Sequence, residues 1–391
     1  MQQQNSLTQL GQLLEKMQQY ENTQSKILEH LKKASCIYLL APTSFLGTSF
    51  TVPITQRLTA MGKPVVLVDD TLPAAPSAIS HCTVIKTTNF SQHTSSEAVS
   101  INMANTVFAY GFFKTVAKNA NTPCIDIIPV LDAFDLPVIY QTAQTMRTAT
   151  MQRVDDYMAL AAQLDDALSV QTLGACLEMR ISMNRNALTP VLCSLEDEYF
   201  SPYAAGKNVT FSMGEKEVFC DIGAHIGMTI KKFLTATQWS YSAIHAFEPD
   251  TGNYAALQQG IFQDLSSFHA KNIALSDSKK TLNFSETGTM GSRLDGSGNV
   301  QVQTSTLDDE VEHATFIKMD VEGHEASILH GAQRLISQSK PKLAITGYHF
   351  ADDLLNISKL IKEIEPRYRL RLRQHSFYYY DTILYADMNN D

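Results

Sequence analysis

Two acidic residues, each at the end of an apolar stretch, have the type and spacing needed to bind a nucleoside cofactor. Asp221 opens a turn that contains Gly223, Ala224 and Gly227. Glycine lets the backbone approach a ligand closely, and the free N–H groups of the following helix face that ligand. Glu248 follows Gly227 by about 20 residues, the spacing at which an acid accepts hydrogen bonds from ribose hydroxyls.

The order of these residues favours S-adenosyl-L-methionine over NAD. The carboxylate of Asp221 can accept a hydrogen bond from an ammonium group, directly or through water, but it would repel a pyrophosphate. Each motif alone has an ordinary alternative, because acid–glycine turns are common and Glu248 could cap the helix expected near 253–259. Asp277, with Ala274 and Leu275, ends a third apolar run, where an adenine edge would lie, and a Ser-Asp-Ser turn is the alternative for Asp277.

Three polar residues, Asp320, Glu322 and His324, alternate after a fourth apolar run. Methyl transfer to an alcohol requires that the hydroxyl is held in line and loses its proton. We expect Asp320, which also borders the cofactor, to be the base or orienting group, with His324 second and Glu322 contacting the substrate. His349, after the fifth run, is another candidate for the base or for a substrate contact. We expect no metal site, although Asp320, Glu322 and His324 form an alternative metal-binding set.

A Gly/Ser-rich segment, 288–298, carries Ser292 and Arg293. A flexible loop with an arginine suits a lid that contacts the substrate, and an ordinary surface loop fits the same composition. We interpret Ser292 and Arg293 as substrate contacts.

The elements that position these residues form an α/β pattern. Apolar runs alternate with helical segments and end in two runs close enough to pair as an antiparallel hairpin. A dinucleotide dehydrogenase usually continues with parallel strands instead, so the pattern predicts the Rossmann-like sheet of a class I methyltransferase, parallel with an antiparallel C-terminal hairpin. The predicted strands are 217–221, 242–248, 268–275, 314–320, 342–346, 368–373 and 381–385.

A smaller Rossmann-like α/β domain is predicted to come first. Its turn at 41–47 has a single glycine and carries Pro42 and Phe45, and Asp69 stands where a ribose-binding acid would be. We favour a Rossmann-like domain that binds no nucleotide. An amphipathic segment at 6–33 would pack on this domain or pair with a second subunit. The predicted strands are 36–40, 64–69, 82–86, 106–110 and 124–130.

Three regions follow from this pattern: an accessory domain at 1–140, a helical connector at 141–190 and a cofactor-binding domain at 191–391. The net charge of −9 and the lack of a basic run argue against a nucleic-acid partner. Six scattered cysteines without a CxxC pair indicate reduced thiols. We expect no membrane span and no secretory signal, and therefore a cytoplasmic protein.

The C-terminal half resembles the FkbM family of S-adenosylmethionine-dependent methyltransferases. The matching motifs are Asp221-Ile222-Gly223-Ala224-His225-Ile226-Gly227, Ala246-Phe247-Glu248-Pro249, Thr306-Leu307-Asp308 and Ile317-Lys318-Met319-Asp320-Val321-Glu322-Gly323-His324-Glu325. The resemblance implies a class I fold and methylation of hydroxyls on sugars, polyketides or other small metabolites. The N-terminal half resembles the degenerate Rossmann-like domain of some bacterial members. His225 stands where many members have asparagine.

Together these observations predict an enzyme, an S-adenosyl-L-methionine-dependent O-methyltransferase that acts on a hydroxyl of a small metabolite, sugar or glycan. The alternatives are an NAD-dependent oxidoreductase or sugar-modifying enzyme, and a non-catalytic cofactor-binding protein. The amphipathic N-terminal helices make a homodimer a further expectation.

Overall fold

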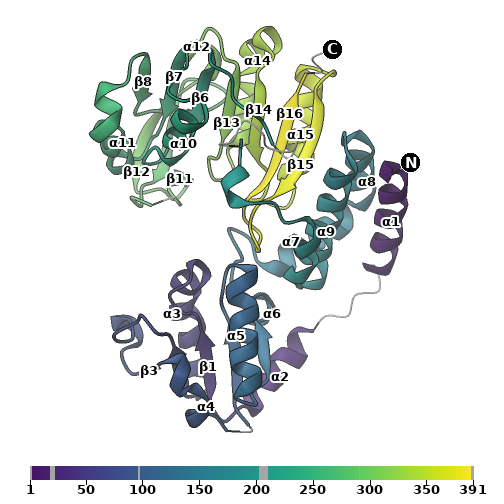
Figure 1. The fold of residues 1–391 in the computed structure, drawn as a ribbon, viewed down its shortest axis with the longest axis vertical. Coiled ribbons are helices and arrows are strands. Elements are labelled where there is room, and N and C mark those ends of the chain that lie inside the picture. Colours follow the sequence, from purple (N-terminus) through teal and green to yellow (C-terminus); the bar gives the residue numbers. More distant parts are fainter. Residues whose placement is uncertain (1, 18–22, 96, 202–209, 290, 389–391) are drawn as a thin grey trace.

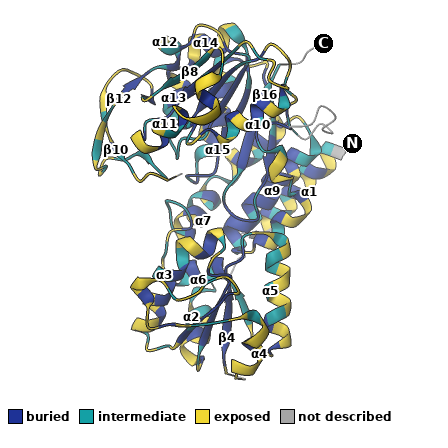
Figure 2. Ribbon diagram, turned by 60° about the vertical axis from the view of Figure 1, so that its left-hand side comes forward, coloured by how far each residue is buried: buried dark blue, intermediate teal, exposed yellow. Residues whose placement is uncertain are grey.

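A computed structural model describes residues 2–17, 23–95, 97–201, 210–289 and 291–388. Figure 1 shows two lobes, each built around a β-sheet, with a group of helices between them. In Figure 2 the strands of both sheets are mostly buried, and exposed residues gather on the outer helices and loops. Among the described helices, none combines the length and apolar character needed to cross a membrane.

The first sheet is parallel throughout, with strand order β3-β2-β1-β4-β5. Its strands are β1 (Ile37–Leu40), β2 (Val65–Val68), β3 (Thr83–Ile85), β4 (Val99–Asn102) and β5 (Cys124–Asp126). Its helices are α2 (Gln24–Lys33), α3 (Phe45–Ala60), α4 (Phe90–His93), α5 (Val107–Asn119) and α6 (Ile127–Ala133), with short 3-10 turns at Ser77–Ile79 and Thr87–Asn89.

The strand predicted at 106–110 is wrong, because this segment begins helix α5. The Thr106 side chain accepts a hydrogen bond from the backbone N–H of Ala109 and caps the helix. The fourth strand is β4, which lies earlier and is fully buried. The run predicted at 124–130 is likewise shorter, since Asp126 accepts a hydrogen bond from Ile128 and starts α6.

Helices α7 (Ala143–Gln152), α8 (Val154–Gln163) and α9 (Ala167–Ser182) lie between the two sheets, followed by 3-10 segments at Arg185–Val191 and Leu195–Asp197. Helix α1 (Gln2–Met17) packs against α9, with Leu10 and Leu14 buried in the core of the second lobe. The apolar face of α1 is thus used within the chain. The homodimer stays a prediction.

The second sheet has strand order β15-β16-β14-β13-β6-β7-β8. Strand β16 is antiparallel to both β14 and β15, and the remaining neighbours are parallel. This arrangement confirms the predicted sheet with its antiparallel hairpin. The strands are β6 (Val218–Ile222), β7 (Ala243–Phe247), β8 (Phe268–Lys271), β13 (Phe316–Met319), β14 (Lys342–Thr346), β15 (Arg369–Gln374) and β16 (Thr382–Asp387).

The connections of this sheet are mostly short helices: α10 (Met228–Ala236), α11 (Thr251–Leu257), a 3-10 turn at Gly260–Asp264, α12 (Leu307–Glu310), α13 (Glu325–His330), α14 (Gln333–Ser339) and α15 (Asp353–Ile364). The run predicted at 268–275 divides into β8 and β9 (Ala274–Leu275), and β9 belongs to a separate small sheet. The other strands of the small sheet are β10 (Thr281–Ser285), β11 (Arg293–Leu294) and β12 (Val300–Ser305).

The turn between β15 and β16 inserts aromatic side chains into the core of the first lobe. Phe377, Tyr378 and Tyr379 are buried in that core, and the Tyr378 hydroxyl donates a hydrogen bond to the carbonyl of Val138 at 3.0 Å. We refer to residues 377–380 as the aromatic plug. The ring of Tyr380 packs edge-on against Phe45 at the start of α3, so the plug covers the turn that follows β1.

Asp69, predicted at the ribose position of the first sheet, is engaged by its own neighbours. Its carboxylate accepts hydrogen bonds from the Thr43 hydroxyl and from the backbone N–H groups of Thr71 and Leu72. The Asp69 carboxylate is therefore held by hydrogen bonds within its own lobe.

Arg185 should be a main stabiliser of the contact between the two lobes. Its buried guanidinium donates to Asp126 at 2.7 Å and to the carbonyl of Ala104 at 2.6 Å, and it stacks on Phe377. We expect Arg185→Met to lower the free energy of unfolding by about 3 kcal/mol in urea titrations, because Asp126 loses its partner. Lys33→Met, which removes an exposed ion pair, is the control and should change nothing measurable. Equal effects of the two variants would contradict this role.

Candidate active site

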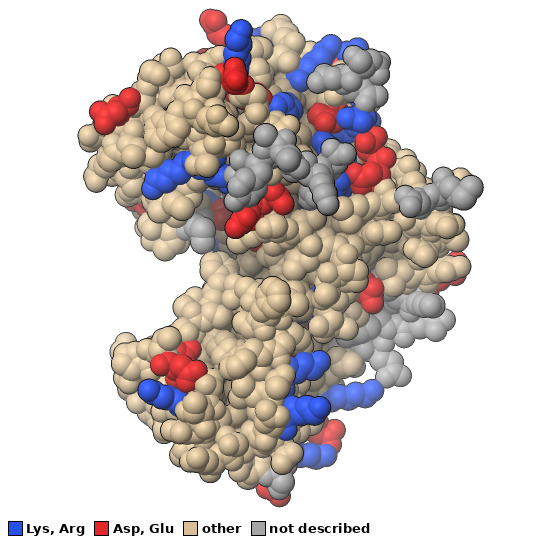
Figure 3. All heavy atoms as spheres, in the orientation of Figure 1, with Lys and Arg blue, Asp and Glu red and all other residues tan. Residues whose placement is uncertain are grey.

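A cavity of about 790 Å³ lies at the carboxyl ends of strands β6, β7 and β13. Its lining comes from both lobes and includes Phe45 and Phe108 of the first lobe and Glu248 and Asp320 of the second. Figure 3 shows the surface deeply hollowed between the lobes, on the left of the view. Ligands of open α/β sheets bind at this edge.

The turn after β6 needs its two glycines for different reasons. Gly223 has φ +77°, and a Cβ there would lie 1.9 Å from the carbonyl oxygen of Asp320. Gly227 has φ +80°, and a Cβ there would lie 2.3 Å from the ring of Phe262. Gly223 and Ala224 line the cavity, whereas Gly227 supports the turn from behind. The backbone of β13 can therefore approach this turn only because Gly223 lacks a side chain.

Glu248 joins the end of β7 to the same turn. One carboxylate oxygen accepts a hydrogen bond from the backbone N–H of His225 at 2.7 Å, and the other accepts from that of Asp250 at 2.9 Å. Burial raises the pKa of Glu248 to about 7, although these two N–H groups lower it. Glu248 lines the cavity, and a carboxylate has further lone pairs that can accept two ligand hydroxyls.

Asp221 does not line the cavity, and its contact with a cofactor ammonium, directly or through water, stays a prediction. It is fully buried, and the ammonium that it meets is that of Lys318, 3.1 Å away. Lys318 also donates to the carbonyl of Gly223 at 2.7 Å. Burial lowers the pKa of Lys318, but Asp221 and Asp320 raise it more, so Lys318 remains charged. The sequence analysis did not single out Lys318. A lysine inside an apolar strand could have indicated a buried ion pair, because lysine is rarely buried without a partner.

Asp320 faces the cavity and is held by aromatic hydroxyls. The Tyr199 hydroxyl donates to one carboxylate oxygen at 2.8 Å, and the Tyr348 hydroxyl lies 3.5 Å from the other. Glu322 also lines the cavity and accepts a hydrogen bond from the Tyr140 hydroxyl at 2.6 Å. The sequence offered no local signal for Tyr140 or Tyr199, because both lie far along the chain from the carboxylates that they contact.

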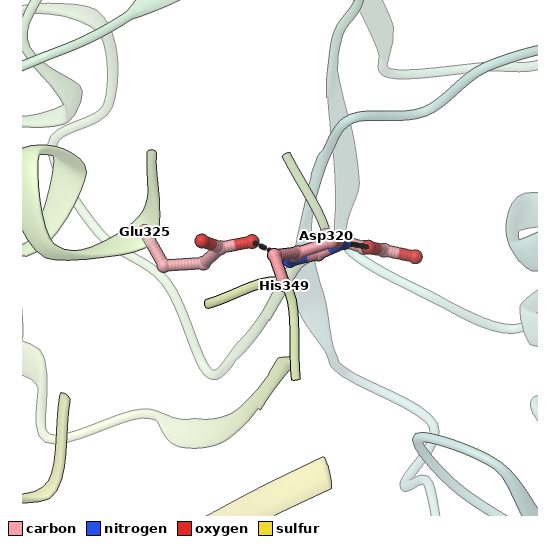
Figure 4. Close-up of side chains that lie close together, drawn as sticks. All are labelled: Asp320, Glu325 and His349. Atoms are coloured by element: carbon pink, nitrogen blue, oxygen red, sulfur yellow. Dashed lines mark ion pairs between the residues drawn. The ribbon is translucent and has the colours of Figure 1, made fainter. Parts of the chain in front are cut away.

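His349 lies behind Asp320, outside the cavity lining, which corrects its predicted contact with an acceptor. Its Nε2 is 3.5 Å from Asp320 and 3.1 Å from Glu322, and its Nδ1 is 3.2 Å from Glu325. Figure 4 shows Asp320 and Glu325 approaching the ring from opposite sides. Burial lowers the pKa of His349, but Glu325 and Glu322 together raise it well above its usual value.

His324 lines the cavity on the side of the small sheet, away from the carboxylates. One ring nitrogen lies 3.0 Å from the hydroxyl of Ser276, and burial lowers its pKa, so the ring is neutral near pH 7. Ala274 and Leu275, expected at the adenine edge, line the same side. The structure thus brings His324 together with the predicted cofactor contacts and separates it from Glu322, with which the sequence had grouped it.

Ser292 and Arg293 both line the cavity, as expected for a loop near the substrate. The Ser292 hydroxyl donates to Asp250 at 2.7 Å, which ties the Gly/Ser-rich loop to the end of β7. The Arg293 guanidinium stacks 4.1 Å from the ring centre of Tyr140 and pairs with Asp295. The contact between Arg293 and Tyr140 joins this loop to the segment that precedes helix α7.

Comparisons with known proteins show what the second lobe is similar to. Residues 221–371 match the sequence family described as the methyltransferase FkbM domain. The fold is similar to the crystal structure of a methyltransferase FkbM from Methylobacillus flagellatus KT, with a TM-score of 0.76. The two sequences are 23% identical, and the alignment covers 98% of this chain and 100% of that one. The predicted family resemblance and fold class are confirmed.

Other structural similarities are weak. A precorrin-6y C5,15-methyltransferase from Geobacter metallireducens GS-15 has a TM-score of 0.29 and 9% identity over 44% of this chain and 80% of its own. LepI in complex with SAM has a TM-score of 0.27 and 11% identity over 62% of this chain and 64% of its own. Such scores support no argument about this chain. No curated protein matches the sequence significantly.

Gly223→Ala should destabilise the protein more than an alanine at another left-handed glycine. Gly260 is the matched control, because its φ is +64° and a Cβ there meets no described atom within 4 Å. Each substitution carries the cost of the left-handed conformation, roughly 1–2 kcal/mol. Gly223→Ala adds the collision with the Asp320 carbonyl and should show a clearly larger loss in urea unfolding. Equal losses would mean that β13 can move away from the turn.

Proposed function

Because residues 221–371 form an FkbM methyltransferase domain, we propose that the chain transfers a methyl group from S-adenosyl-L-methionine to a hydroxyl of a sugar, glycan or other small metabolite. One observation carries this proposal: the glycine turn after β6, Glu248 and Asp320 line one cavity. This arrangement supports a cofactor on one side and an acceptor on the other.

The cofactor would be held by residues at the ends of β6, β7 and β9. The backbone at Gly223 and Ala224 can approach it closely, and Glu248 can accept hydrogen bonds from its ribose hydroxyls. Ala274 and Leu275 offer an apolar surface for its adenine ring. When bound, S-adenosyl-L-methionine supplies an electrophilic methyl group on a positively charged sulfur.

The acceptor would lie beside Asp320. A carboxylate at this position can accept a hydrogen bond from the acceptor hydroxyl, orient its oxygen and take its proton. The Tyr199 hydrogen bond fixes the Asp320 carboxylate, so its orientation is set before an acceptor arrives. Glu322, Ser292 and Arg293 surround the same part of the cavity and would contact the rest of the acceptor.

Thermal-shift and calorimetric titrations with S-adenosyl-L-methionine, S-adenosylhomocysteine and NAD test the cofactor. We expect stabilisation by the first two and none by NAD. Stabilisation by NAD alone would overturn the proposal.

Incubation of the protein with a metabolite extract and isotope-labelled S-adenosyl-L-methionine, followed by mass spectrometry, identifies the acceptor. Binding without any methylated product would indicate a non-catalytic cofactor-binding protein.

Glu248→Gln should weaken S-adenosylhomocysteine binding by about 1–3 kcal/mol, the contribution of a hydrogen bond to a charged group. Because burial raises the pKa of Glu248 to about 7, the native protein should also bind more tightly at pH 8 than at pH 6, where the protonated carboxyl accepts hydrogen bonds less well. Calorimetry across this range measures both effects, and the variant should lack the pH dependence. Glu312→Gln, an exposed residue with the same change of charge, is the control. A pH-independent affinity in the native protein would contradict the role of Glu248.

Asp320→Asn should lower turnover at least about 100-fold, the typical contribution of a positioned general base, and leave the affinity for S-adenosylhomocysteine nearly unchanged. The amide keeps the shape of the carboxylate but cannot take the acceptor proton. Incorporation of labelled methyl groups into the product measures turnover. Asp277→Asn is the control, since Asp277 is paired with Lys280 and lies outside the cavity lining. Unchanged turnover would show that Asp320 is not the base.

A further inference from the structure

We propose that Asp320, Glu322 and His349 bind a divalent metal ion of the Mg²⁺ or Mn²⁺ type at the edge of the cavity. Asp320 and Glu322 follow β13, and His349 follows β14, its parallel neighbour. The proposal concerns a site beyond methyl transfer itself, and metal binding can be measured whether or not the chain proves to be an O-methyltransferase.

Two carboxylates approach the same ring nitrogen of His349. Nε2 of His349 is 3.1 Å from a carboxylate oxygen of Glu322 and 3.5 Å from one of Asp320. Two ligands at right angles around an ion, each about 2.1 Å from it, are about 3.0 Å apart. The two separations from Nε2 are close to this value. Oxygens of Asp320 and Glu325 and a ring nitrogen of His349 also lie within 4.8 Å of one another.

The environment of His349 is further evidence for a bound ion. Its side chain is fully buried, and among the described residues neither ring nitrogen has a hydrogen-bond partner of acceptable geometry, despite the nearby carboxylates. A buried imidazole normally forms hydrogen bonds through its nitrogens, because leaving a buried polar group unpaired costs about 1–3 kcal/mol. A cation between Nε2 and the two carboxylates would satisfy all three groups at once.

Glu325 supports His349 from the opposite side, as Figure 4 shows. Its carboxylate oxygen lies 3.2 Å from Nδ1 and accepts hydrogen bonds from the Val321 backbone at 3.1 Å and the Thr346 hydroxyl at 2.9 Å. A carboxylate at the second nitrogen of a metal-binding histidine keeps the proton there and leaves Nε2 as the ligand. Glu325 therefore fits the role of an orienting residue rather than that of a ligand.

The donor set and its exposure indicate the kind of ion. The proposed ligands are two carboxylate oxygens and one imidazole nitrogen. A set made up mainly of hard oxygen donors favours Mg²⁺ or Mn²⁺ over a metal that prefers thiolates. The side chains of Asp320 and Glu322 are 24% and 17% exposed, whereas that of His349 is not exposed at all. The open coordination positions would therefore face the cavity, where an acceptor oxygen or water can bind.

This site differs from what the sequence indicates. The sequence predicts no metal and offers His324 as the alternative third ligand to Asp320 and Glu322. In the structure His324 contacts Ser276 instead, and His349, which is 25 residues further along the chain, takes its place. The matched pair of histidines gives the test its control.

Mn²⁺ binding to the full-length protein tests the proposal, measured by equilibrium dialysis and by the electron paramagnetic resonance signal of free Mn²⁺. We expect one tight site, weakened at least about 10-fold by His349→Gln and by Glu322→Gln. His324→Gln should leave the affinity unchanged. Thermal unfolding of each variant checks folding, and Glu322→Gln keeps the test valid if His349→Gln fails to fold. Absence of Mn²⁺ binding, or binding unaffected by both variants, would overturn the proposal and leave an imidazolium between carboxylates.

Discussion

The buried ion pair between Lys318 and Asp221 joins the two central strands of the second sheet, β13 and β6, at the point where the cavity begins. The same ammonium donates to the carbonyl of Gly223, so one lysine anchors both the strand and the turn that follows it. Breaking a buried pair by removing one partner typically costs about 3–5 kcal/mol, because a charge is left without compensation. The position of Asp320, two residues after Lys318, therefore depends on this interaction as well as on the missing side chain of Gly223.

The first lobe contributes one wall of the cavity. Phe108 from the start of α5 and Phe45 from the start of α3 line the cavity, and both are largely exposed in this structure. The aromatic plug holds that wall in place, because Tyr378 is anchored in the first lobe while the strands on either side of it belong to the second sheet. The first sheet and the aromatic plug thereby support the aromatic side chains that line the cavity.

Much of the second sheet could be predicted from the sequence, because strands such as β6, β7 and β13 are short, mostly apolar runs that end next to a glycine or an acid. Glu248 was found in the same way, by its distance from the glycine turn. The strand predicted at 106–110 is wrong because the Thr106 hydroxyl accepts a hydrogen bond from the backbone N–H of Ala109 and caps a helix, which apolar periodicity does not reveal. Contacts such as Tyr140 with Glu322 connect residues 182 positions apart, and no local pattern encodes them.

The charges around Asp320 do not balance within the cluster. Four acidic side chains, those of Asp221, Asp320, Glu322 and Glu325, form these ion pairs with only two basic ones, those of Lys318 and His349. Buried carboxylates without compensation are costly, and tyrosine hydroxyls offset only part of that cost. In the proposed complexes a sulfonium cofactor would add one positive charge to this region. A divalent ion would displace a proton from Nε2 of His349 and so would also add a net positive charge. Both proposals therefore involve the same few acidic residues.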